Sequence, residues 1–138
     1  MANKVIIDTG VIVALLDKSD EHHIWAVSAV KYLQGQFLSC EAVLAEACYL
    51  LRHYPRQQQQ VLGYIMNGTI ALSLRAGQEM GRISVLMERY AGRMDFADAC
   101  IVRMAELEEE ARVLTVDSDF LFYRKNGRSL IPLIAPFA

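Results

Sequence analysis

The chain has 138 residues, of which 54% are hydrophobic, and it carries a formal net charge of −2. That length fits a single domain over residues 1–138, and the hydrophobic fraction suffices for a sizeable core and is too high for a disordered chain. The slight negative charge argues against non-specific binding to nucleic acid, and no apolar run reaches the roughly 20 residues of a membrane span. The N-terminal MANKVIID lacks the apolar stretch and cleavage site of a signal peptide, so we expect a cytoplasmic protein that does not bind a membrane.

Short apolar runs alternate with helical segments in the first half of the chain. Residues 5–7 end at an acid and are typical of a buried strand, which Thr9-Gly10 then breaks before a helix begins. Gly35 ends a second helix, and Pro55 ends a third because proline disfavours helical geometry in the residue before it. The expected elements are a strand at 5–7, helices at 9–16 and 20–34, a strand at 36–38, and helices at 41–53 and 56–66.

The second half continues this alternation after the turn residues Asn67-Gly68. The expected elements are a strand at 69–74, helices at 76–90 and 94–109, and strands at 112–116 and 129–133. Strands that alternate with helices indicate an α/β domain with a mainly parallel sheet.

Two acids follow apolar strands directly. Asp8 comes after Val-Ile-Ile, and Asp117 comes after Val-Leu-Thr-Val. Both are therefore expected at the carboxyl ends of strands, which is where open α/β sheets place their ligand sites.

Two further acids lie in predicted helices. Glu46 is part of AVLAEACYLL, and its neighbours three and four positions away are apolar, which makes a carboxylate costly there unless it is paired or binds a metal. Asp98 follows Asp95 by three residues, so both lie on one side of a helix near its N-terminus.

A single such acid is commonly a helix cap or an ion-pair partner, but four of them indicate a shared role. Carboxylates that converge need a cation to offset their mutual repulsion. Oxygen ligands favour Mg²⁺ or Mn²⁺ over zinc, and two such ions can activate a water and stabilise the leaving oxygen of a phosphodiester. The chain offers no competing base, because His22 and His23 point in different directions on a helix and His53 stands alone.

Charge is unevenly distributed along the chain. Residues 51–93 carry six arginines and two acids, whereas residues 94–123 carry eight acids and two arginines. A basic region beside an acidic cluster suits a surface that binds phosphate around a cation, although solvated helix faces explain the same pattern. The three cysteines, Cys40, Cys48 and Cys100, lie in apolar contexts and are expected to be buried free thiols.

Four segments resemble, in the same order, the four motif blocks of PIN-domain ribonucleases. They are IIDTGVIVALLD, AVLAEACYLL, MDFADACIVRMAE and VLTVDSDFLFYR, and they span residues 5–124. The resemblance is greatest to VapC-type toxins of prokaryotic toxin–antitoxin pairs and to their stand-alone relatives. It implies a three-layer α/β/α sandwich with a mainly parallel sheet, a Mg²⁺- or Mn²⁺-dependent endoribonuclease, an RNA substrate, an antitoxin partner and a homodimer.

The resemblance also assigns residues. It implies that the catalytic and metal-binding acids are Asp8, Glu46, Asp98 and Asp117. It also implies two supporting hydroxyl residues, Thr9 and Thr115, and two extra acids, Asp95 and Asp119. The residues themselves leave Asp95 open as a helix N-cap and Asp119 open as a cap of the following turn. Arg93, Arg124 and Lys125 adjoin the blocks and are candidate RNA contacts, with ordinary surface charge as the alternative.

Two other functional classes compete with the nuclease. The first is a non-catalytic RNA-binding or regulatory module of the same fold, which an incomplete acid set would favour. The second is a phosphatase that uses Asp8 as a nucleophile. Enzymes of that type carry a second Asp two residues later, where this chain has Gly10.

Overall fold

The structure is a computed structural model, and it describes residues 4–138. Its central sheet has five strands in the order β3-β2-β1-β4-β7, and every neighbouring pair is parallel. The strands are β1 (Val5–Ile7), β2 (Phe37–Ser39), β3 (Ile70–Leu72), β4 (Arg112–Leu114) and β7 (Leu133–Ile134). The parallel sheet predicted from the alternating elements is therefore confirmed.

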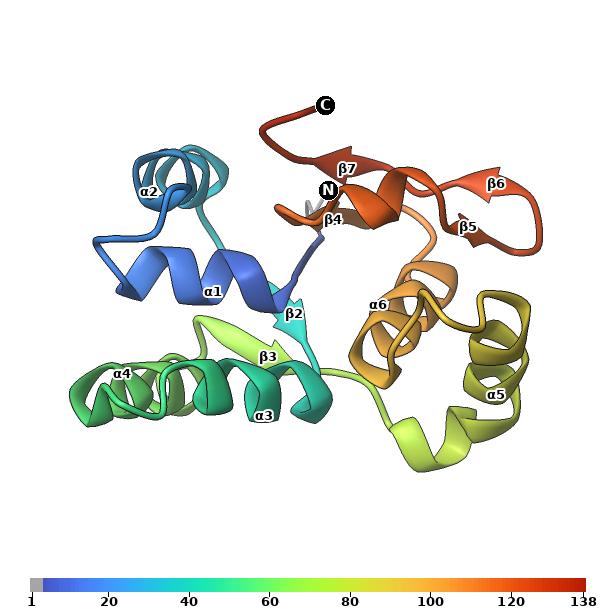
Figure 1. The fold of residues 1–138 in the computed structure, drawn as a ribbon, viewed down its shortest axis with the longest axis horizontal. Helices are drawn as coiled ribbons and strands as arrows, with labels where there is room; N and C mark the ends of the chain where they lie inside the picture. The colour runs from blue at the N-terminus through green and yellow to red at the C-terminus, as the bar shows by residue number, and fades with distance from the viewer. Residues whose placement is uncertain (1–3) are drawn as a thin grey trace.

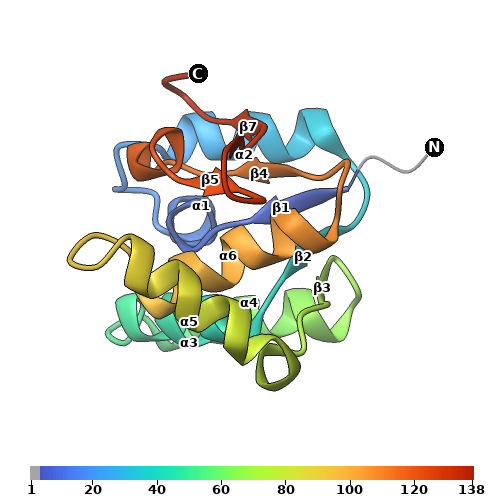
Figure 2. The ribbon, with the colours of Figure 1, turned by 90° about the vertical axis from the view of Figure 1, so that its right-hand side faces the viewer.

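Within residues 4–138, six α-helices cover the two faces of the sheet. One face carries α1 (Thr9–Leu16), α2 (His23–Leu33), α3 (Glu41–Leu50) and α4 (Pro55–Met66), and the other carries α5 (Met80–Arg89) and α6 (Phe96–Leu107) (Figure 1). Figure 2 shows α5 and α6 in front of the sheet. These layers form the expected α/β/α sandwich. No helix within residues 4–138 is both long enough and apolar enough to cross a membrane.

The central strand is apolar because helices cover it from both sides. Val5, Ile6 and Ile7 are each at most 3% exposed, and they form a continuous apolar run rather than an alternating one. Such runs are the signature of parallel strands buried on both faces.

The chain reverses direction across the sheet at β1. It first moves outward from β1 to β2 and β3, and it then returns to place β4 on the other side of β1. The backbone N–H of Asp8 donates to the carbonyl of Leu114 at 3.0 Å, so the ends of β1 and β4 lie side by side. A crevice opens beyond the carboxyl ends of two such strands, and this is where α/β sheets bind ligands.

The C-terminal region differs from the prediction of one strand at 129–133. Residues 129–130 form β6 (Ser129–Leu130), which pairs antiparallel with β5 (Arg124–Lys125) across a tight turn, and β7 begins only at Leu133. Three residues, 126–128, connect the two strands, and Asn126 and Gly127 among them have positive φ, which Asn and Gly adopt at low cost. Pro132 separates β6 from β7, and its carbonyl accepts from Val113. The expected helix at 76–90 also differs, because its first four residues form the 3₁₀ helix η1 (Ala76–Glu79).

A buried ion-pair network attaches α5 and the hairpin to α6. The Glu106 side chain is 1% exposed, and it accepts two hydrogen bonds from Arg82 at 2.9 and 2.7 Å and one from Arg103 at 3.0 Å. It also accepts from the backbone N–H of Asn126 at 2.7 Å. Nothing in the sequence around Glu106 indicates that its side chain is buried.

All three cysteines are free thiols, as expected. Cys40 and Cys100 are buried, whereas Cys48 is only half-buried. The expectation of burial was therefore wrong for Cys48, which lies on α3 where the helix faces solvent more than its apolar sequence suggests.

Candidate active site

One pocket brings together the acids that the sequence singled out. It has a volume of about 350 Å³ and lies beyond the carboxyl ends of β1 and β4. Six carboxylates line it: Asp8, Glu46, Asp95, Asp98, Asp117 and Asp119. The remaining lining residues are Thr9, Gly10, Leu50, Arg93 and Val116. The acids come from four separate segments of the chain, so only the fold makes them neighbours.

Asp8 is the most buried of these acids, with 5% of its surface exposed. It caps α1, where its Oδ1 accepts from the backbone N–H of Thr9 at 2.8 Å. Its Oδ2 accepts from the Thr115 hydroxyl at 2.8 Å. Burial raises the pKa of Asp8 to about 6, and the charges of Asp117 and Glu46 add to that effect. The pocket therefore already disfavours further negative charge.

Two threonines connect Asp8 to the acids of two other segments, Glu46 in α3 and Asp117 after β4. The Thr9 hydroxyl donates to Glu46 Oε1 at 2.6 Å, which ties α3 to the start of α1. The Thr115 hydroxyl donates to Asp8 and accepts from the backbone N–H of Asp117 at 3.0 Å. A continuous chain of hydrogen bonds thus runs from Glu46 through Asp8 to Asp117. Both threonines are buried, and their hydroxyl groups hold the carboxylates in place by hydrogen bonds.

Asp95 and Asp98 form the N-terminal cap of α6. Asp95 Oδ1 accepts from the backbone N–H of Asp98 at 2.8 Å, and Asp98 Oδ2 accepts from the backbone N–H of Asp95 at 3.3 Å. This reciprocal pair is a capping box. It gives Asp95 the N-cap role that the residues left open, and it still leaves both carboxylates on the pocket wall.

Tyr123 is a site residue that the sequence analysis missed. Its ring is fully buried, and its hydroxyl lies 3.1 Å from Asp98 Oδ2 and 3.2 Å from the carbonyl oxygen of Arg93. Burial and the neighbouring Asp95 raise the pKa of Asp98 to about 7, while the Tyr123 hydrogen bond acts in the opposite direction. Tyrosine in an apolar segment reads as a core residue, so only the position of its hydroxyl reveals this contact.

Asp117 and Asp119 lie at the start of the 3₁₀ helix η2 (Ser118–Leu121). Asp117 is the N-cap, and its Oδ1 accepts from the backbone N–H of Asp119 at 2.9 Å. Burial raises the pKa of Asp117, and the charges of Asp119 and Asp95 raise it further. Asp119 itself does not cap the turn, and its Oδ1 lies 3.8 Å from Arg93 Nε.

Glu46 is more accessible than its apolar helix suggests. Its neighbours Tyr49 and Leu50 are 62% and 49% exposed, so this side of α3 borders solvent rather than the core. The carboxylate is half-buried and accepts from Thr9 through Oε1 alone, which leaves Oε2 without a protein donor among residues 4–138. The expected apolar burial of Glu46 was therefore wrong, although the residue does line the pocket.

Two of the three candidate RNA contacts have other partners. Lys125 is 8% exposed, and its ammonium donates to the carbonyl oxygen of Glu109 at 3.1 Å at the end of α6, where a cation is favourable. Arg124 donates to the carbonyl oxygens of residues 121–123. Neither lines the pocket, so an RNA contact by these two residues would lie outside it. Arg93 does line it.

The chemistry of the donor set fits a hard divalent cation. The donors are carboxylate and hydroxyl oxygens, which Mg²⁺ and Mn²⁺ prefer, and the pocket holds six acids against one arginine. Within residues 4–138, no three histidine, cysteine, aspartate or glutamate side chains stand together at the spacing of metal ligands. The fit therefore rests on the donors and on the charge that they concentrate.

Gly10 allows α1 to approach the strand end that carries Asp117. A Cβ atom at this position would lie 2.6 Å from Val116 Cγ2, so Gly10→Ala displaces Val116. We expect this substitution to destabilise the protein by about 1–3 kcal/mol in urea unfolding, the usual cost of overpacking. Gly63→Ala in α4 is the matched control: its Cβ meets nothing within 4 Å, and it should stabilise the helix by up to about 1 kcal/mol. Stabilisation by both substitutions would contradict the close approach.

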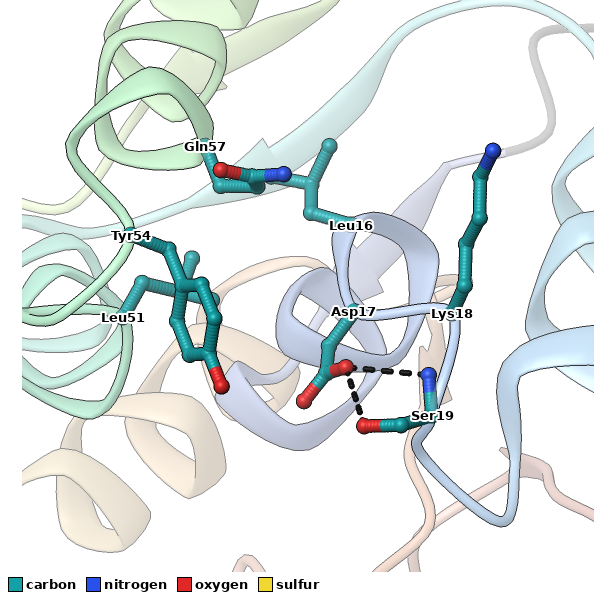
Figure 3. A pocket seen from close by; sticks show the side chains of 7 residues that line it. All are labelled: Leu16, Asp17, Lys18, Ser19, Leu51, Tyr54 and Gln57. Carbon is teal, nitrogen blue, oxygen red and sulfur yellow. Dashed lines mark hydrogen bonds between the residues drawn. The ribbon is translucent and has the colours of Figure 1, made fainter.

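A second pocket lies at the other end of α1. It has a volume of about 340 Å³, and Figure 3 shows its seven lining side chains, from Leu16 at the end of α1 to Gln57 in α4. Its one acid, Asp17, accepts from the backbone N–H of Ser19 at 3.0 Å and from the Ser19 hydroxyl at 2.6 Å. Lys18 points away from that carboxylate (Figure 3). This pocket lacks a set of converging reactive groups, so the acid-lined pocket is the candidate active site.

Comparison with known proteins agrees with this architecture. The PIN domain profile matches residues 5–126, which is most of the chain. The crystal structure of VapC20 from Mycobacterium tuberculosis, described as a Sarcin-Ricin loop cleaving toxin, superposes with a TM-score of 0.74. The match covers 83% of this chain and 91% of that chain at 17% sequence identity, which establishes a shared fold. No curated protein sequence matches the chain. The profile match over residues 5–126 places the chain in the PIN domain family.

Proposed function

We propose that this protein is a metal-dependent endoribonuclease that hydrolyses RNA phosphodiester bonds with Mg²⁺ or Mn²⁺. The observation that carries the proposal is the convergence of Asp8, Glu46, Asp98 and Asp117 on one pocket at the carboxyl edge of the sheet. Membership of the PIN domain family and the likeness to a toxin described as cleaving the Sarcin-Ricin loop support an RNA substrate.

Asp8, Asp98 and Asp117 would hold the cation, with Asp95 and Asp119 as further donors on the pocket wall. When bound, the ion lowers the pKa of a water molecule and offsets negative charge at the phosphate. Thr9 and Thr115 fix the carboxylates in place through the hydrogen bonds described above. Glu46 lines the same pocket, and its Oε2 has no protein donor within residues 4–138, so Glu46 is positioned to accept a proton from the attacking water.

A toxin of a type II toxin–antitoxin pair is the biological role that we propose for this nuclease. The likeness of the fold to VapC20 supports this role. The proposal includes an antitoxin protein partner, a homodimer and a cytoplasmic location. RNA binding without turnover under any divalent ion would instead favour the non-catalytic RNA-binding module.

Metal binding should be detectable as thermal stabilisation. At a Mn²⁺ concentration about 100-fold above the dissociation constant, linkage predicts about 2.7 kcal/mol of added stability, which raises the melting temperature by roughly 8 °C. The measurement is a thermal melt with Mn²⁺ or with chelator, beside an RNA cleavage assay under the same two conditions. Cleavage should require the metal.

Two variants control this experiment. Asp117→Asn removes a pocket carboxylate and should abolish most of the shift in melting temperature. Glu88→Gln removes an exposed acid from α5, outside the pocket, and should keep the full shift. RNA cleavage that survives chelation, or an equal shift in both variants, would refute the assignment of the metal to this pocket.

A further inference from the structure

Arg93 is the one basic side chain among the described residues that line the acid pocket. Its side chain is 48% exposed, and its nearest acid, Asp119, lies 3.8 Å away, beyond hydrogen-bond distance. Arg82 and Arg103, in contrast, donate directly to carboxylates at 2.7 to 3.0 Å. The guanidinium N–H groups of Arg93 thus have no acceptor within residues 4–138 and are available to a ligand.

The Arg93 guanidinium stacks on an aromatic ring. Its central carbon lies 4.2 Å from the centroid of Phe122, which is 52% exposed. A cation over an aromatic face is attracted by the ring, so this contact holds the planar guanidinium beside Phe122. The pair therefore presents a flat, cationic and partly apolar surface at the rim of the pocket.

The partly buried ring of Tyr90 and the buried ring of Tyr123 hold this surface in position. The Phe122 ring packs edge-to-face against Tyr90 at 5.8 Å, and Tyr90 packs in the same way against Tyr123 at 5.2 Å. The Tyr123 hydroxyl lies within hydrogen-bond distance of both Asp98 and the backbone of Arg93. The pair of Arg93 and Phe122 is thus connected to Asp98 through the packed rings of Tyr90 and Tyr123. The fold therefore sets the position of the pair relative to the carboxylates.

We propose that Arg93 and Phe122 form a platform that binds the nucleotide next to the scissile phosphate. This inference rests on the proposed ribonuclease function. The guanidinium donates to a neighbouring phosphate, and an unpaired base stacks on the flat surface that the pair presents. Bases stack on aromatic rings and on arginine planes when they are free of their own neighbours in a helix. The single positive charge in an acidic pocket draws the RNA backbone to this side of the site.

The test separates base stacking from attraction to the backbone. The probes are a fluorescent oligoadenylate and an abasic oligoribonucleotide of the same length, measured by fluorescence anisotropy with Mg²⁺. All proteins carry Asp8→Asn, so that cleavage does not interfere. Phe122→Leu should weaken oligoadenylate binding about 10-fold, the typical loss for one stacked base, and should leave binding of the abasic strand unchanged. Arg93→Ala should weaken binding of both.

Tyr32→Leu is the matched control, because Tyr32 is an aromatic residue that is 87% exposed. It lies near the end of α2, just before β2 begins, and it does not line the acid pocket. It should change neither affinity. Phe122→Trp retains a ring and should bind oligoadenylate at least as tightly as the parent. Equal loss for both probes in Phe122→Leu, or no loss for either, would overturn the platform and leave the proposed nuclease intact. Failure of the parent protein to bind either RNA would also overturn the platform, whereas the proposed nuclease is decided separately by cleavage of RNA by the wild type with metal or with chelator.

Discussion

Replacement of Asp8 by asparagine is expected to abolish RNA cleavage and, at the same time, to stabilise the metal-free protein at neutral pH. The loss of activity follows from the removal of a proposed metal ligand. Substitution of a residue that only hydrogen-bonds to a metal ligand typically lowers metal affinity or activity about 10- to 100-fold. Loss of a ligand itself should therefore lower the cleavage rate at least about 100-fold. Glu88→Gln, outside the pocket, should retain full activity.

The gain in stability follows from the direction of the Asp8 pKa shift. Burial raises the pKa of Asp8 from 3.8 in its ordinary state to about 6 in the folded protein. Between these two pH values the folded protein binds the proton and the unfolded chain does not, so stability falls as the pH rises through this window. Above pH 6 the ionised carboxylate costs about 3 kcal/mol.

Asparagine cannot ionise, so the variant escapes this cost. Its bond with Thr115 must be rearranged, which lowers the expected gain to about 2 kcal/mol at pH 7. Urea unfolding in chelator at pH 4 and at pH 7 measures the effect, and the two proteins should differ little at pH 4. Addition of Mn²⁺ at pH 7 should stabilise the wild type and reduce the difference. A variant less stable than the wild type at pH 7 would contradict the stated cost of the Asp8 charge.

Replacement of Glu106 by alanine is expected to destabilise the protein strongly, although Glu106 lies outside the acid pocket. The substitution leaves Arg82 and Arg103 without their shared acceptor and removes the bond to the backbone of Asn126. Removal of one partner from a buried ion pair costs 3–5 kcal/mol, and because both arginines retain some exposure we expect about 3 kcal/mol in urea unfolding. Glu106→Gln should cost less because it keeps one acceptor oxygen.

Glu108→Ala is the matched control for this prediction. Glu108 is the C-cap residue of α6, two positions after Glu106. Its side chain pairs at 2.8 Å with Lys4, whose side chain is 50% exposed. Exposed pairs contribute little, so this substitution should change stability only slightly. Equal losses for Glu106→Ala and Glu108→Ala would show that the network around Glu106 does not hold α5 and the hairpin in place.

The parts of the site that could be predicted from the sequence carry a local signal. Asp8 and Asp117 each follow an apolar strand, and that position alone predicts a place at the carboxyl edge of the sheet. The three-residue spacing of Asp95 and Asp98 likewise placed both on one side of a helix, where the structure shows a capping box. The order of strands and helices predicted the α/β domain with a mainly parallel sheet for the same reason, whereas the three layers were implied by the family resemblance.

The parts that could not be predicted depend on contacts between distant residues. Lys125 looks like a surface cation in the sequence, but the hairpin folds it against the carbonyl end of α6. Glu106 stands among acids at a helix end, and only the packing of α5 buries it. Tyr123 reads as a core aromatic until its hydroxyl is placed beside Asp98. In each case the polar partner is many residues away in the sequence, so no local pattern of residues predicts the contact.

The bond between Thr115 and Asp8 spans 107 positions of the chain. Because β4 pairs with β1, the first strand of the chain, Asp117 reaches the pocket only after more than four-fifths of the chain has been synthesised. Closure of so long a loop is slow compared with the formation of helices. A growing polypeptide on the ribosome therefore holds an unfinished acid pocket, and hydrolytic competence appears only when the central strands close.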